Sequence, residues 1–124
     1  PVLTHRMKVQ DYYISNLTSK LIEYVMVFCL DSQNRLIIDE TVSRGTVNQT
    51  SVSPCEIINL VLRHLAHAVI FVRNHPGAET KPSRADIEVS KDIKKALAVM
   101  GIALHDHLIV AGASCVSLKS LGHL

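Results

Sequence analysis

The segment that most constrains the fold is Ala68–Arg73, a short run that is apolar until its last residue. Such a run is typical of a β-strand covered on both faces, because a strand with one solvated face alternates apolar and polar residues. Helix-start patterns flank it, Ser53-Pro54-Cys55-Glu56 before it and Ser83-Arg84-Ala85-Asp86 after it. Each pattern places a serine three residues before an acidic residue, as a capping box does. A buried strand between two helices predicts an α/β fold.

The remaining segments predict a further helix and two hairpins. Apolar residues recur at roughly helical spacing over Lys8–Ile22, and the two capped helices are expected to end near His67 and at Gly101. The strands of the first hairpin are Glu23–Asp31 and Arg35–Ser43, and those of the closing hairpin are Ile102–Val110 and Cys115–Leu118. We therefore expect α/β architecture with a single mixed β-sheet and helices on both faces, forming one domain over residues 1–124.

Length and composition exclude several classes of protein. The 124 residues are 48% hydrophobic and 19% charged, which is typical of a chain that folds around its own core. The longest apolar run, Tyr24–Leu30, is far shorter than the ~20 residues that cross a bilayer. Residues Pro1–Lys8 do not resemble a signal peptide, so we expect a cytoplasmic protein. Because the sequence begins at Pro1 rather than at methionine, we expect it to be the C-terminal domain of a longer protein.

Charge and cysteine usage exclude further partners and sites. Thirteen Lys and Arg residues oppose eleven Asp and Glu residues, and the two signs are interspersed along the chain, so a nucleic-acid groove is not supported. The cysteines Cys29, Cys55 and Cys115 form no CxxC pair, which excludes a zinc knuckle and a redox dithiol. We interpret them as reduced packing residues.

The segment richest in chemistry joins the end of the buried strand to the second capped helix. Here His75 follows the strand, where the strand fixes its backbone and the loop leaves its ring open to a metal or a proton. Ser83 and Asp86 lie at a helix start, where backbone N–H groups favour an anion. Ser83-x-x-Asp86 is equally well explained as a capping box without any function.

Several motifs together suggest a family. These are Glu40, Arg44-Gly45-Thr46-Val47-Asn48, Asn74-His75-Pro76, Pro82-Ser83-x-x-Asp86 and Asp106-His107-Leu108-Ile109-Val110. In order and spacing they resemble bacterial RadC proteins, which have the JAMM (MPN) metalloprotease-like fold with cytidine-deaminase-like architecture. The resemblance implies zinc-dependent peptide or isopeptide hydrolysis and a nominal link to DNA repair.

The resemblance also implies roles for individual residues. Its pattern binds zinc through two histidines of His-x-His-Pro and the aspartate of Ser-x-x-Asp, with water as fourth ligand. Carried over by position, His75 and Asp86 are metal ligands. Glu40 is the general base, and Ser83 stabilises the oxyanion.

One required position differs, because Arg73 stands where the first histidine of His-x-His-Pro should be. Residues 73 and 75 are two apart, so on a strand their side chains point to the same face. Arginine stays protonated and has only donor groups, so it cannot ligate zinc. We therefore expect zinc binding to be weak or absent.

Three explanations of Arg73 remain open. In the first explanation, Arg73 pairs with Asp86 or Glu40 and fills the metal position with a salt bridge. In the second, His107 completes the zinc coordination sphere as a substitute ligand, with His105 and His67 as further candidates. In the third explanation, Arg73 and the helix start bind an anion. The alternative function is then a non-catalytic protein-interaction or anion-binding domain, with a protein or peptide partner; a homo-oligomer is compatible with either function.

Overall fold

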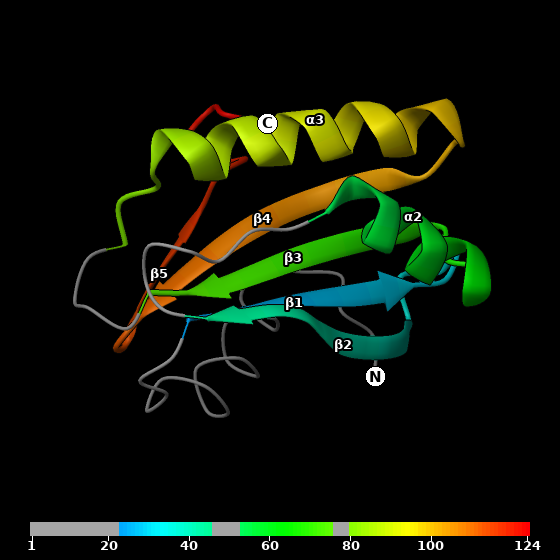
Figure 1. The fold of residues 1–124 in the computed structure, drawn as a ribbon, viewed down its shortest axis with the longest axis horizontal. Coiled ribbons are helices and arrows are strands. Elements are labelled where there is room, and N and C mark those ends of the chain that lie inside the picture. The colour runs from blue at the N-terminus through cyan, green and yellow to red at the C-terminus, as the bar shows by residue number, and fades with distance from the viewer. Residues whose placement is uncertain (1–22, 46–52, 76–79) are drawn as a thin grey trace.

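The computed structural model describes residues 23–45, 53–75 and 80–124 (Figure 1). These residues form five strands and two helices: β1 (Glu23–Leu30), β2 (Leu36–Gly45), α2 (Pro54–Arg63), β3 (Ala68–Asn74), α3 (Arg84–Val99), β4 (Ala103–Ala111) and β5 (Ser114–Ser117). Neither of the two helices in these ranges is long and apolar enough to cross a membrane. The predicted helix Lys8–Ile22 lies outside the described residues.

The strands form one sheet in the order β2-β1-β3-β4-β5. β3 and β4 pair in parallel and the other neighbours pair antiparallel, so the sheet is mixed, as predicted. The parallel pair is joined through α3, because parallel neighbours need a crossover connection. The predicted α/β class and both predicted hairpins are confirmed.

Both described helices pack on the same face of the sheet (Figure 1). Their buried residues, among them Ile57, Val61, Ile93 and Leu97, join Val27 and Phe71 of the sheet in one apolar core. The other face carries a second core that includes Phe28, Ile70 and Leu108. Every residue of β3 is buried, which agrees with the sequence-based prediction of a strand covered on both faces. The prediction of helices on both faces depends on Lys8–Ile22, which the structure does not describe.

The two helices end in the same backbone motif but with different residues. After α3, Gly101 has φ 71°, its N–H donates to Ala98, and Ile102 N–H donates to Leu97. These bonds form a Schellman motif, and α3 ends at the glycine that the sequence predicts as its stop. α2 ends at Arg63, four residues before the predicted position near His67, because Leu65 adopts φ 53° and closes the same motif without a glycine.

Candidate functional site

The candidate site lies where the end of β3, the start of β1 and the N-terminus of α3 meet. Because β1 and β3 are antiparallel, with Val25 opposite Arg73, the first residue of β1 lies beside the last residues of β3. The side chain of Asn74 fixes this arrangement by accepting a hydrogen bond from Tyr24 N–H at 2.5 Å. The backbone of His75 is held by β4, since its N–H donates to the carbonyl of Val110 at 2.8 Å.

Arg73 is the centre of this site and is 5% exposed. Its Nη1 donates a short hydrogen bond to Oε1 of Glu23, and its Nε lies 3.1 Å from Oδ1 of Asp86. The contact with Asp86 is an ion pair that lacks hydrogen-bond geometry, because Arg73 Nε has no hydrogen-bond partner. One buried guanidinium therefore bridges two buried carboxylates. We call Glu23, Arg73, His75 and Asp86 the Arg73 cluster.

Asp86 joins the Arg73 cluster to the start of α3. Its Oδ2 accepts from Ser83 N–H at 2.9 Å, and its own N–H donates to Ser83 Oγ at 3.0 Å, so the predicted capping box is formed. His75 Nε2 lies 3.5 Å from the same Oδ2. Burial raises the pKa of Asp86, but the contacts with His75 and Ser83 and the charge of Arg73 outweigh it and hold the pKa well below its usual value. Asp86 is therefore a carboxylate at neutral pH.

A buried polar pair, Ser90 and His107, lies near the Arg73 cluster. Ser90 of α3 and His107 of β4 are 0% and 1% exposed, and Ser90 Oγ shares a short hydrogen bond with His107 Nδ1. The His107 ring also packs edge-on against Phe71 at a centroid distance of 5.9 Å. Burial, together with the nearby charge of Arg73, lowers the pKa of His107 to about 3. His107 is thus a neutral, enclosed side chain.

The structure brings together only some of the sequence-predicted residues. His75, Asp86 and Arg73 meet, and Ser83 caps the helix beside them. Glu40 does not join them: it lies on β2 opposite Val27 of β1 and lines a cavity of about 240 Å³ together with α2 residues such as Glu56 and Arg63. β2 is two strands from β3, which separates the two backbones by roughly 10 Å. Arg73 therefore pairs with Asp86, one of the two partners considered in the first of the three explanations, and with Glu23 in place of Glu40.

Sequence reasoning missed Glu23 because it was assigned only as the first residue of a strand. A signal was present: Glu23, Val25 and Val27 alternate along β1 and share the buried face of the sheet. An acidic residue on a buried face requires a cationic or hydrogen-bonding partner. That periodicity identifies Glu23 as a buried carboxylate, although it does not identify Arg73 as the partner.

The predicted substitute ligands have the following surroundings. His107 Nδ1 hydrogen-bonds with Ser90 Oγ, whereas its buried Nε2 has no hydrogen-bond partner among the described residues, and His105 Nε2 is 2.8 Å from Asn34 in the β1–β2 turn. His67 is exposed at the opposite end of β3. In the described ranges, no three His, Cys, Asp or Glu side chains gather so that they could hold a metal ion.

The donor set of the Arg73 cluster does not fit a zinc ion. Structural and catalytic zinc sites use three or four neutral histidines, thiolates or carboxylates. Here a permanent cation lies against both carboxylates, and His75 is the only imidazole in the cluster. A divalent cation would have to displace the guanidinium from Glu23 and Asp86 before it could bind.

Comparison with known proteins gives a consistent family match. The family model described as "RadC-like JAB domain" matches residues 3–123. The chain is similar to UPF0758 proteins, with 41% identity over 116 residues to that of Bordetella pertussis (94% of this chain, 52% of the relative). Identity is 42% over 114 residues for Pseudoalteromonas translucida (92% and 51%) and 39% over 121 residues for Idiomarina loihiensis (98% and 54%). The chain thus spans about half the length of these curated relatives.

Proposed function

Because the chain belongs to the RadC-like JAB domain family, we propose that it is a non-catalytic JAB domain that binds a protein partner, with the Arg73 cluster in the metal position. The observation that supports this proposal is the buried guanidinium of Arg73 between Glu23 and Asp86. An arginine in that position neutralises the carboxylates that a cation would need.

The energetics of buried ion pairs favour this function over a weak metal site. Removing one partner from a buried pair costs about 3–5 kcal/mol, because the remaining charge is left without compensation. Zinc binding at Asp86 would displace Arg73 and leave it buried beside the metal, where the two cations repel each other. We therefore expect wild-type zinc affinity to be weak or absent.

Zinc-dependent peptide or isopeptide hydrolysis is the second candidate function. It is favoured by the family match and by the contact of His75 Nε2 with Asp86 Oδ2 at 3.5 Å, since these are two of the ligands that the family pattern implies. This function requires Arg73 to leave the cluster. The nominal DNA-repair role and the cytoplasmic location stay predictions, as do the partners of the full-length protein.

The test is zinc uptake by the chain and by Arg73→His, both purified without chelator. We expect wild type to hold far less than one zinc per chain by elemental analysis. We expect Arg73→His to gain zinc, because it completes the ligand set next to His75 and Asp86. Arg63→His is the matched control, since it adds a histidine at the exposed end of α2. It should gain no zinc.

The outcomes separate the two candidate functions. Stoichiometric zinc in wild type, with zinc-dependent cleavage of an isopeptide substrate, would overturn the non-catalytic proposal. If Arg73→His takes up no more zinc than Arg63→His, the assignment of this cluster to the metal position is wrong. If the apo variant is unfolded, circular dichroism with and without added zinc reports the same gain.

A further inference from the structure

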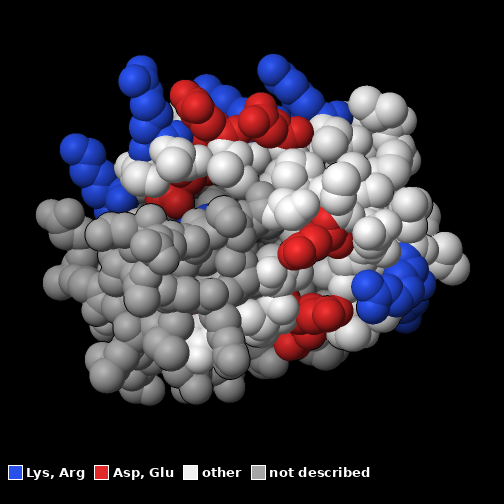
Figure 2. Space-filling model, in the orientation of Figure 1, with Lys and Arg blue, Asp and Glu red and all other residues white. Residues whose placement is uncertain are grey.

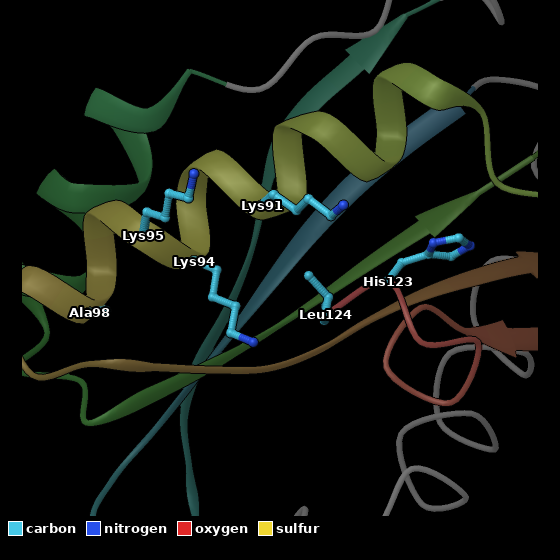
Figure 3. Close-up of a pocket in the computed structure, with 6 residues that line it drawn as sticks. All are labelled: Lys91, Lys94, Lys95, Ala98, His123 and Leu124. Carbon is cyan, nitrogen blue, oxygen red and sulfur yellow. The ribbon is translucent and has the colours of Figure 1, made fainter.

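A groove lies between α3 and the C-terminal segment (Figure 3). It has a volume of about 380 Å³, which is within the range of ligand pockets. Its lining residues are Lys91, Lys94, Lys95 and Ala98 of α3, together with His123 and Leu124. Figure 3 shows Lys94 extending from the helix on the side of the C-terminal segment, Lys91 running along the helix, and the ammonium of Lys95 pointing to the opposite side. The groove lies apart from the Arg73 cluster, since none of that cluster's residues lines it.

The rim of the groove is cationic, because its lining includes three lysines and no acidic residue. Lys91, Lys94 and Lys95 are exposed, and none of them forms an ion pair with another residue in the described part of the chain. Lys91 and Lys95 are four residues apart on a helix, a spacing at which like charges repel each other. Lys91 and Lys94 therefore offer ammonium groups that an acidic ligand can pair with.

The floor of the groove is apolar. Leu124 packs against the core cluster that α2 and α3 share, and Ala98 presents only a methyl group. The four-carbon stems of the lysines add apolar walls below their charged ends. A ligand that matches both parts of the groove carries carboxylates beside an apolar side chain.

A protein segment fits this chemistry better than a nucleic acid does. The groove contains no aromatic side chain on which a base could stack. Acidic residues, among them Glu88 and Asp92, lie on the same helix, and Figure 2 shows Asp and Glu side chains interspersed with Lys and Arg along the α3 edge. Because neither carboxylate lines the groove, they confine the cationic surface to it, so a long polyanion that continues along the helix would meet them whereas a short acidic segment would not.

We propose that this groove docks an acidic linear segment of a partner protein, with carboxylates on Lys91 and Lys94 and one apolar side chain over Ala98 and Leu124. The proposal rests on the proposed function, because it gives the chemistry of the partner that a non-catalytic domain would bind. It adds a binding surface that is separate from the Arg73 cluster.

The experiment selects random-sequence peptides displayed on phage against the wild-type chain. We expect the recovered peptides to be enriched in Asp and Glu next to an apolar residue. Their affinity, measured by fluorescence anisotropy with the synthetic peptides, should fall about tenfold or more for the Lys91→Glu/Lys94→Glu variant. Lys81→Glu, a charge reversal at an exposed lysine outside the groove, is the matched control and should bind as wild type does.

Further measurements check both halves of the proposed ligand. Replacing the apolar residue of a recovered peptide by serine should weaken binding, and raising the salt concentration should weaken it for wild type more than for the double variant. Circular dichroism verifies that each variant is folded. If a variant with two reversals is unfolded, Lys91→Gln and Lys94→Gln are measured singly, each with a smaller expected loss.

Three results would overturn the proposal. The first is recovery of no binder, or of binders without acidic residues. The second is binding that the groove variants leave unchanged. The third is tighter binding of the groove to a single-stranded oligonucleotide or to anionic vesicles than to the acidic peptides. Because the zinc assay on Arg73→His does not involve the groove, failure of this proposal and failure of the proposed function are distinguishable.

Discussion

At the scale of single residues, Arg73 determines the chemistry of the candidate site. Its guanidinium forms ion pairs with two buried carboxylates, Glu23 and Asp86. A lysine could not do this equally well, because it lacks the planar set of donors that reaches two carboxylates at once. The same residue lowers the pKa of His107 through its charge. Arg73 therefore affects both stability and protonation in this region.

We predict that Arg73→Met lowers the free energy of unfolding by about 3–5 kcal/mol, because it leaves buried carboxylates without a partner. Adding Glu23→Gln to this variant should recover part of the loss, since the glutamine is neutral. Urea denaturation at neutral pH measures both values. A loss below about 1 kcal/mol for Arg73→Met would show that the ion pairs are not compensating buried charge.

We also predict that His107 makes the protein less stable as the pH falls from about 6.5. The unfolded chain takes up a proton near pKa 6.5, whereas the folded protein holds the pKa of His107 at about 3. Between these values the unfolded state binds more protons, so the free energy of unfolding decreases as pH falls, by up to about 1.4 kcal/mol per pH unit. Asp86 adds its own loss only at lower pH, because its ordinary pKa is 3.8 and its folded pKa is lower still.

The measurement is urea unfolding of wild type and His107→Gln across this pH range. The glutamine variant retains a polar group opposite Ser90 but has no proton to take up. Its free energy of unfolding should depend less on pH than that of wild type above about pH 4. Parallel pH profiles for the two proteins would contradict the assignment of His107 as the source of the slope.

At the scale of secondary-structure elements, the ends of the helices show how local sequence and backbone geometry interact. Gly101 ends α3 at the predicted residue because glycine adopts positive φ without a steric penalty. Leu65 has the corresponding position after α2, and it is 79% exposed. A leucine in this conformation costs free energy and gains little from burial. Sequence reasoning missed this end because no glycine marks it.

We predict that Leu65→Gly stabilises the protein by roughly 0.5–1 kcal/mol, because it removes the steric cost of positive φ. Gly101→Ala should destabilise it by a similar amount. A Cβ at Gly101 meets no atom within 4 Å, so its effect would come from the backbone conformation alone. Thermal or urea unfolding of the two variants tests the pair, and a destabilising Leu65→Gly would contradict the argument.

At the scale of the whole molecule, the fold encloses one cysteine in the sheet and leaves another exposed on a helix. Cys29 lies in the central part of the sheet at 0% exposure, and burial, with the nearby charge of Glu40, raises the pKa of its thiol to about 11. Cys55 is exposed in the first turn of α2. The two thiols therefore differ in their accessibility to a reagent in solution, and this difference comes from the tertiary structure.

We predict that iodoacetamide modifies Cys55 rapidly in the native protein and Cys29 only at the rate of global unfolding. The thiolate is the reactive form, and Cys29 is both enclosed and protonated at neutral pH. Mass spectrometry of Cys55→Ser after timed labelling isolates Cys29, with the half-buried Cys115 as an internal reference. Rapid labelling of Cys29 in native buffer would show that the sheet opens locally at β1.

The sequence by itself determined the strand and helix segments of the described region apart from the C-terminal end of α2, the capping box of Ser83 and Asp86, and the exclusion of Arg73 as a ligand. Each of these depends on periodicity, spacing or side-chain chemistry within a short stretch. Only the tertiary structure decided which glutamate meets Arg73. Glu23 and Glu40 both lie on strands of the first hairpin, and the choice depends on the pairing of β1 with β3 across 50 residues of sequence. Such long-range register is fixed by packing of the whole sheet, so no local pattern specifies it.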